Sequence, residues 1–339
     1  MNLPRLRLPI VPASFFGMVL GLVGLGNSWR AAHAVWGLPS VVGEVLMLAG
    51  GIVWAILVVL FAAKWLAARD LARDEANHPV QCCFIGLAGV ATMLVAMALE
   101  PYARVLSLGV FAAGAAFTLG FAVWRTGDLW QGGGRDPAHT TPVLYLPTVA
   151  GSFVTATACG ALGFADWGRF AFGAGLLSWL AIESVLVHRI LTAPQMPPAL
   201  RPTLGIQLAP PTVGAVAYLS VTSGPPDLVA YALVGYGLLQ ILLLARLARW
   251  IFADGVKASA WSFTFGLTAF ATAMVKMAGR GDTGPALVLA PFAFALVTAL
   301  MAALILWTLR LFLAGRLLPA APAPRPAVPE PPAALAERS

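Results

Sequence analysis

Stretches of about 20 apolar residues recur along almost the whole chain, and they constrain its fold more than any other feature. A helix of about 20 residues is needed to cross the roughly 30 Å hydrocarbon core of a bilayer. Against that length, the sequence predicts ten transmembrane helices, at 12–29, 40–66, 80–99, 102–125, 142–163, 168–190, 204–222, 228–249, 259–279 and 286–312. The expected fold class is therefore an all-α integral membrane protein.

The composition agrees with a bilayer as the solvent for most of the chain. Of 339 residues, 60% are hydrophobic and 10% are charged, whereas about 25% are charged in soluble domains. Residues 1–318 are predicted to form one transmembrane domain, and 319–339, rich in Pro and Ala, a disordered cytoplasmic tail. A signal peptide cleaved near Ala34 is the less simple alternative, because many further spans follow.

Positive charge is divided unequally between the two ends of these helices. With ten crossings, sixteen of the 21 Lys and Arg residues fall on the side of the N-terminus. The other side keeps five, which are Arg30, Arg104, Arg169, Lys276 and Arg280. Since cytoplasmic loops carry the excess of Lys and Arg, both termini are predicted to be cytoplasmic. No basic cluster alternates with exposed aromatic residues, so nucleic acid is not an expected partner.

The helices alternate in character, with a repeat of about 60 residues. Odd-numbered helices begin with segments rich in Pro, Gly, Ser, Thr and Phe, whereas even-numbered helices are smooth apolar runs. Proline-broken helices persist in a membrane only where protein or a water-filled cavity surrounds them. The pattern predicts five hairpins that are joined by longer cytoplasmic links such as 67–79. The five inner helices of these hairpins are expected to surround a pseudo-fivefold central pore. For any single glycine or proline, helix packing is the competing interpretation.

Ionisable residues are scarce within the predicted spans. Glu183 alone lies clearly inside one, on an even-numbered helix, where pairing with His188 or Arg189 is favoured over a role in transport. No fixed positive charge is expected deep in an inner helix, because Lys276 lies near the far end of the ninth. A wall of hydroxyl groups, small residues and Phe fits the weak binding and fast passage of a neutral or anionic solute.

The sequence contains no motif that indicates an enzyme. GxSxG, HExxH and GxxxxGK[ST] are all absent. His78 with Cys82 and Cys83 could be drawn as metal ligands, but adjacent cysteines inside an apolar helix make a poor site. Neither a metal nor a cofactor is therefore expected. Together with Cys159, these cysteines are predicted to be buried thiols outside any disulfide.

Several segments resemble the bacterial TehA tellurite-resistance proteins, which are relatives of the slow-type anion channels of plant guard cells. They include PASFFGMVLG, TTPVLYLPTVAGSF, LGIQLAPP and WSFTFG, and the similarity extends through every predicted hairpin. The resemblance implies a homotrimer in the bacterial inner membrane, with one pore in each protomer. It implies a gate, matched by Phe265, and a facing glycine, matched by Gly17. The other pore-lining positions that it implies are Phe16, Phe84, Phe153 and Pro210.

The function predicted from these features is a channel for small monovalent anions such as chloride or nitrate. The alternative is a proton-coupled secondary carrier for tellurite or C4-dicarboxylates, which should contain an ionisable relay along the conduit. A membrane scaffold or sensor with a vestigial pore is a third and weaker alternative.

Overall fold

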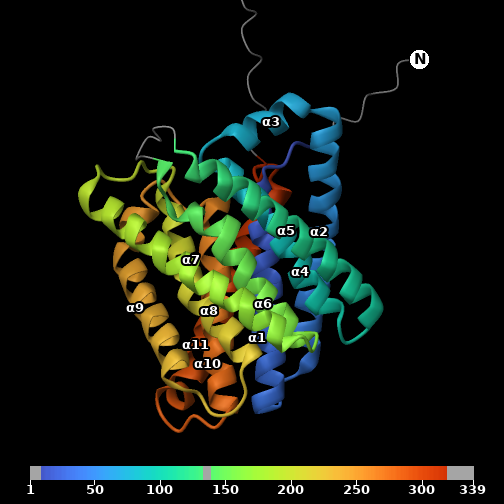
Figure 1. The fold of residues 1–339 in the computed structure, drawn as a ribbon, viewed down its shortest axis with the longest axis vertical. Helices are drawn as coiled ribbons and strands as arrows, with labels where there is room; N and C mark the ends of the chain where they lie inside the picture. Colours follow the sequence, from blue (N-terminus) through green and yellow to red (C-terminus); the bar gives the residue numbers. More distant parts are fainter. Residues whose placement is uncertain (1–8, 133–138, 319–339) are drawn as a thin grey trace, which may run out of the picture.

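A computed structural model describes residues 9–132 and 139–318, and every regular element in these ranges is helical (Figure 1). Nine of the described helices are long and apolar enough to cross a membrane. The prediction of an all-α membrane protein is confirmed. The count of ten stays a prediction, because α1 (Phe16–Trp36) is not among these nine helices. It lies in the same bundle, but Asn27 and Arg30 in its second half make it less apolar than those nine.

The long helices pair in chain order as hairpins, each made of an inner and an outer helix. Every inner helix begins with short 3-10 or π segments and continues as an α-helix. The inner helices are η1 (Ala13–Phe15) with α1, η2 (Gln81–Gly86) with α4 (Leu87–Leu99), η4 (Pro142–Leu144) and η5 (Leu146–Ala150) with α6 (Gly151–Ala161), η6 (Arg201–Leu208) with α8 (Ala209–Val221), and η7 (Ala258–Phe263) with α10 (Thr264–Gly279). The outer helices are α2 (Ser40–Ala67), α5 (Arg104–Trp130), α7 (Ala165–Thr192), α9 (Leu228–Ile251) and α11 (Pro285–Leu313).

Burial separates the two kinds of helix. Among the spans of α4, α6, α8 and α10, 67–78% of the most apolar stretch is buried, against 17–33% for the outer helices. In α1, every residue from Met18 to Gly26 is buried. The outer helices leave large apolar side chains such as Leu48 and Phe170 exposed, as lipid-facing helices do. The assignment of broken helices to the inside and smooth helices to the outside is therefore confirmed.

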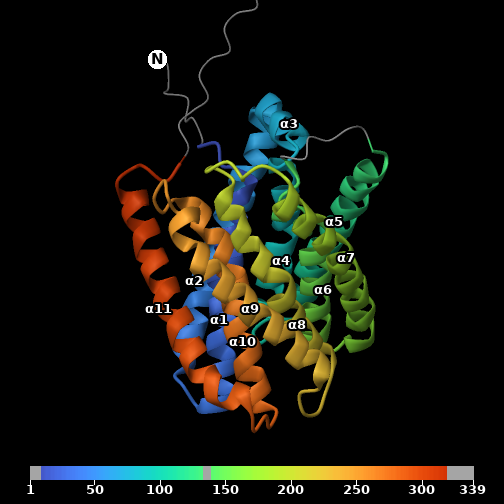
Figure 2. The ribbon, with the colours of Figure 1, turned by 90° about the vertical axis from the view of Figure 1, so that its left-hand side faces the viewer.

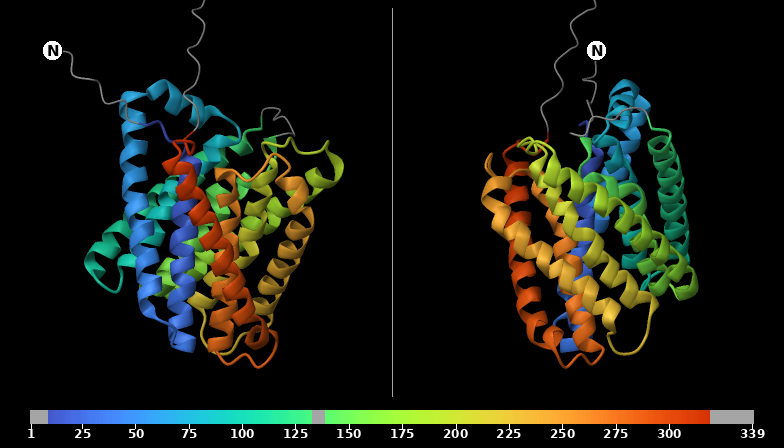
Figure 3. Two further views of the ribbon diagram at one scale, coloured as in Figure 1. Left: turned by 180° about the vertical axis from the view of Figure 1, so that it is seen from behind. Right: turned by 60° about the vertical axis from the view of Figure 1, so that its left-hand side comes forward.

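The inner helices form a closed ring. In the contacts between elements, α1 packs against α4, α4 against α6, α6 against α8, α8 against α10, and α10 against α1. Figure 3 shows the first hairpin beside the last, where α1 contacts both α10 and α11. Each outer helix packs on the inner helix of its own hairpin. The ring encloses the centre of the bundle; exact fivefold symmetry stays a prediction.

The two ends of the bundle differ. The short helix α3 (Arg69–Asn77) lies across the end where the inner helices begin, which is called the α3 end below (Figures 1 and 2). The opposite end, called the hairpin end, carries the links 37–39, 100–103, 162–164, 222–227 and 280–284. Because all inner helices run from the α3 end to the hairpin end, position along each of them measures depth in the ring.

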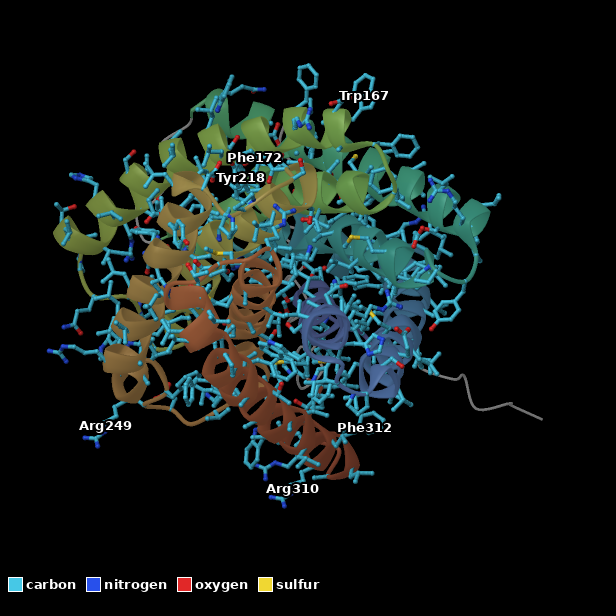
Figure 4. All side chains as sticks on the ribbon, turned by 90° about the horizontal axis from the view of Figure 1, so that it is seen from below. Trp167, Phe172, Tyr218, Arg249, Arg310 and Phe312 are labelled. Atoms are coloured by element: carbon cyan, nitrogen blue, oxygen red, sulfur yellow. The ribbon has the colours of Figure 1, made fainter. Side chains whose placement is uncertain are left out.

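Seen from below (Figure 4), polar and aromatic side chains of the outer helices spread away from the bundle. Arg249 of α9 and Arg310 of α11 point outward, as does Trp167 of α7, which is 72% exposed. Phe172 of α7 and Tyr218 of α8 instead lie together, with ring centroids 5.4 Å apart, where an outer helix meets an inner one.

Two local predictions were wrong. The segment 67–79 was expected to be a link, but it contains α3. Helix α1 was expected to end at residue 29, but it continues to Trp36. The charge of Arg30 does not end it, because the guanidinium forms a salt bridge of 2.7 Å with Glu44 of α2 and donates to the carbonyl oxygens of Met97 and Ala98.

Candidate functional site

A cavity of about 210 Å³ lies inside the ring, at the α3 end of the inner helices. All five inner helices contribute lining residues, mostly from their 3-10 or π segments and the first turns that follow. None of the described residues that line it is charged. Its polar side chains are Ser14, Gln81, Tyr145, Thr203, Ser259 and Ser262.

Proline explains why two of the inner helices are irregular where they surround the cavity. Pro147 lies in η5, a π segment, and Pro210 and Pro211 lie in the first turn of α8. Proline has no N–H to donate, and its ring clashes with the carbonyl group four residues earlier. In a membrane such backbone is tolerated only inside protein or beside a cavity, and these segments satisfy that condition because they line the central space.

The cavity ends near the middle of the ring. The deepest lining residue on each inner helix is Leu20, Leu87, Phe153, Val213 or Phe265. All five are apolar, so they form an apolar floor between the cavity and the hairpin end. Hydrophobic constrictions in known channels gate the passage of ions by dewetting.

The structure brings five of the six predicted site residues to this cavity. Gly17, Phe84, Phe153, Pro210 and Phe265 all line it. Phe16 does not: it is 2% exposed, and its ring packs edge-on against Phe61 of α2 at 5.8 Å. Neighbouring residues on a helix point about 100° apart, so with Gly17 towards the cavity, Phe16 turns towards the outer helix.

Phe265 is the half-buried aromatic residue of α10 that faces the cavity. Phe263 points elsewhere, because its ring packs on Phe252 at 5.4 Å and covers Gly205. A methyl group on Gly17 would meet no atom within 4 Å, so this glycine opens onto the cavity without touching Phe265. The α1 glycine beside the Phe265 ring is Gly24, where a methyl group would lie 3.6 Å from Cδ2.

A carboxylate lies behind one wall of the cavity. Glu183 extends inward from α7, and its Oε1 accepts hydrogen bonds from Tyr236 Oη at 2.6 Å and Gln207 Nε2 at 2.9 Å. Its Oε2 accepts from Trp179 Nε1 at 2.9 Å and from the hydroxyl group of Tyr145. Four donors, two from inner helices and two from outer helices, thus converge on one carboxylate, which can only accept hydrogen bonds. Tyr145 connects this carboxylate to the cavity.

Sequence reasoning missed this cluster. It placed Glu183 on an outer helix, away from the pore, and paired it with nearby residues of the same helix. The signal that could have found it is the presence of Tyr145 and Gln207, two large polar residues at the starts of otherwise apolar inner helices. Buried polar groups in a membrane need partners, and Glu183 is the acceptor within their reach.

A buried ion pair fixes the mouth of the cavity. Lys64 Nζ of α2 lies 2.5 Å from Glu75 Oε2 of α3 and donates to the carbonyl oxygen of Val11 at 2.8 Å. The backbone N–H of Ala13 donates to Glu75 Oε1 at 2.8 Å. Helix α3 therefore holds the start of the first inner helix in place at the α3 end.

The residues once considered as metal ligands have structural roles. His78 Nδ1 accepts hydrogen bonds from the backbone N–H groups of Val80 and Gln81 at 3.1 and 3.2 Å, which closes the turn before η2. All three cysteines are buried and outside any disulfide, as predicted. Within the described ranges, no cluster of three or more His, Cys, Asp or Glu residues is arranged to hold a metal ion.

These features define a class of protein: a multi-pass membrane protein with a closed ring of broken helices around a central uncharged cavity. The comparison with known families agrees. Residues 11–312 match the SLAC1 family, described as voltage-dependent anion channels. The chain belongs to this family of membrane anion channels and transporters.

The relatives differ in how much of their own length aligns with this chain. The tellurite resistance protein TehA homolog of Haemophilus influenzae is 35% identical over 261 residues, which is 77% of this chain and 79% of that protein. The guard cell S-type anion channel SLAC1 of Arabidopsis thaliana is 24% identical over 312 residues, or 88% of this chain and 55% of the plant protein. An uncharacterised transporter of Methanocaldococcus jannaschii is 24% identical over half of this chain. The chain thus spans about half the length of the plant relative.

Proposed function

We propose that the protein is a channel for small monovalent anions such as chloride and nitrate, with Phe265 closing the resting pore. The observation that carries this proposal is the cavity enclosed by all five inner helices, which ends at an apolar floor containing Phe265. Because none of its described lining residues is charged, the cavity neither attracts cations nor holds an anion tightly. Weak binding is the condition for fast passage through a channel.

A proton-coupled carrier for tellurite or C4-dicarboxylates is the second candidate. The observation in its favour is Glu183, an intramembrane carboxylate hydrogen bonded to Tyr145, which lines the cavity. Intramembrane acids are often parts of proton relays. Against it, both carboxylate oxygens of Glu183 already accept hydrogen bonds from Tyr, Trp and Gln side chains, which is the arrangement of a structural anchor.

Currents across a planar bilayer separate the two candidates. For a channel, the reversal potential follows the chloride gradient and is unchanged when a pH gradient is imposed. For a carrier, an imposed pH gradient drives flux at zero voltage, and replacement of Glu183 by Gln removes that dependence. The absence of any anion flux in proteoliposomes would exclude both and favour a scaffold.

We expect weakly hydrated anions to pass at least as well as chloride. The floor residues Leu20, Leu87, Phe153, Val213 and Phe265 offer little to replace lost hydration, so the anion that is cheapest to dehydrate should be favoured. Bi-ionic reversal potentials with nitrate, iodide and chloride measure this order. A preference for fluoride, or for sodium over chloride, contradicts the proposal.

The protein is further proposed to lie in the bacterial inner membrane with the α3 end in the cytoplasm. A reporter fused after Arg316 is expected to read cytoplasmic, and one inserted near Gly224, in the link before α9, is expected to read outside. The reason is the excess of Lys and Arg at the α3 end. Alkaline phosphatase and green fluorescent protein fusions provide the measurement; an active phosphatase at Arg316 would reverse the orientation.

The homotrimer implied by the family resemblance is also kept as a proposal. The large apolar side chains exposed on the outer helices, such as Leu177 of α7 and Leu242 of α9, are compatible with contacts to lipid or to another protomer. The mass of the detergent-solubilised protein, measured by light scattering, gives the number of protomers.

A further inference from the structure

Two cations at the hairpin end lack a carboxylate partner. Three of the five basic residues predicted on that side form salt bridges: Arg30 with Glu44, Arg104 with Glu100, and Arg169 with Asp166. The other two, Lys276 and Arg280, lie one turn apart near the end of α10. Within the described residues, neither has a carboxylate oxygen within 4.0 Å.

The acids nearest in sequence are engaged elsewhere. Asp227 accepts from the N–H groups of Val229 and Ala230 at the start of α9, and from the hydroxyl group of Tyr218. Asp282 accepts from the N–H groups of Gly284 and Ala286 at the start of α11, and from the hydroxyl group of Tyr231. Both carboxylates therefore cap helices instead of neutralising the end of α10.

Arg280 and Lys276 differ in how their donors are used. One Arg280 nitrogen, Nη2, donates to the carbonyl oxygens of Leu219 and Thr222, and Nη1 lies 3.4 Å from Thr222 Oγ1. Arg280 thus ties α10 to the end of α8. Lys276 Nζ donates to Ser220 Oγ at 3.1 Å, and an ammonium group has three protons to donate. Two of them have no protein acceptor among the described residues.

Helical geometry places Lys276 on the face of α10 that is directed to the lumen. It follows Phe265 by eleven residues, which is a rotation of about 20° and a displacement of about 16 Å along a helix. Its partner Ser220 follows Val213 by seven residues, which is a rotation of about 20° in the opposite sense. Since Phe265 and Val213 both line the floor of the cavity, Lys276 and Ser220 continue the same two faces beyond that floor.

The third inner helix in this region, α6, packs against the same part of α8. Gly160 of α6 follows Phe153, another floor residue, by seven residues, and α8 packs closely on it: an added methyl group would clash with the backbone oxygen of Ser220. The side chain of Lys276 is only partly exposed. Ser220 Oγ donates its own proton to Val216 O at 2.7 Å and accepts from Lys276, which holds the ammonium group against the wall.

We propose that Lys276 binds a small monovalent anion in the lumen at the hairpin end, with Ser220 as the residue that positions its ammonium group. This inference rests on the proposed function, since it places a binding site in the same conduit, on the other side of the Phe265 floor. A cation that is partly withdrawn from water without a counter-ion is costly, and a passing halide or nitrate supplies one. The site binds anions at the hairpin end of the conduit, whereas the uncharged floor sets how fast they cross.

Bromide tests the site without requiring conduction. Crystals of the full-length protein grown in sodium bromide are expected to show an anomalous scattering peak in contact with Lys276 Nζ, and crystals of Lys276→Met none. Lys276→Arg, which keeps the charge, is expected to retain the peak. A wild-type protein without bromide at Lys276, or a Met variant that keeps it, would overturn the proposal.

Currents test the role of the site in the conduit. With Phe265→Ala as the background, Lys276→Met is expected to raise the chloride concentration for half-maximal conductance about tenfold, equivalent to about 1.4 kcal/mol of binding free energy. Lys257→Met is the matched control, because Lys257 is exposed at the opposite end of the same inner helix. Equal half-saturation in the Met variant and its background would overturn the proposal while leaving the channel function intact. If no variant conducts anions, the channel function fails, and the bromide peak alone decides the site.

Discussion

Replacement of Phe265 by alanine is expected to raise anion conductance at least about tenfold, which corresponds to a barrier lowered by about 1.4 kcal/mol. The ring lies in the apolar floor of the cavity with Leu20, Leu87, Phe153 and Val213. Its removal widens the floor, admits water and lets an anion keep more of its hydration shell. Single-channel or macroscopic currents of purified protein in planar bilayers provide the measurement.

Phe263→Ala is the matched control for the Phe265→Ala prediction. Phe263 is also a half-buried aromatic residue of the same inner helix, but it packs on Phe252 and over Gly205, away from the cavity. Its truncation is expected to cost up to about 3 kcal/mol of stability and to leave conductance at the wild-type level. If Phe265→Ala also only lowers stability, Phe265 is a packing residue and the gate has to be sought elsewhere.

Replacement of Glu183 by alanine is expected to lower the free energy of unfolding by about 3–5 kcal/mol, because each buried donor left without an acceptor costs about 1–3 kcal/mol. The reason is that Tyr145, Trp179, Gln207 and Tyr236 all donate to this one carboxylate. Without it, four donors in an apolar environment lose their acceptor. Unfolding in detergent, followed by tryptophan fluorescence as SDS is added, gives the change.

Two further variants make this prediction specific. Glu183→Gln keeps one acceptor oxygen and is expected to be intermediate in stability. Asp166→Ala removes a carboxylate from an exposed pair on the same helix, whose Arg169 and Asp166 side chains are 61% and 88% exposed, and is expected to cost less than about 1 kcal/mol. Equal stability of Glu183→Ala and Asp166→Ala would show that the network does not hold the inner and outer helices together.

Several properties of this protein followed from the sequence because each depends on a single segment. The length of the apolar segments predicted the membrane spans. Prolines such as Pro147 and Pro210 predicted which helices are broken and therefore lie inside the bundle. The smooth apolar runs of the partner helices predicted that these face outward. Hydropathy and backbone breaks are local quantities, so no knowledge of neighbouring helices was needed. The same local reasoning ended α1 too early, because the partner that neutralises Arg30 lies on another helix.

The rotation of each helix about its own axis was decided only by the tertiary structure. Whether Phe16 or Gly17 meets the cavity depends on how α1 packs between α2, α4 and α10. The same packing aims Glu183 of an outer helix at Tyr145 and Gln207, and brings Lys276 to Ser220 across two inner helices. A sequence specifies which residues share a helical face, but the direction of that face is set by the contacts of all neighbouring helices at once. For that reason the inner helices could be predicted from the sequence, whereas the polar contacts between them and their neighbours could not.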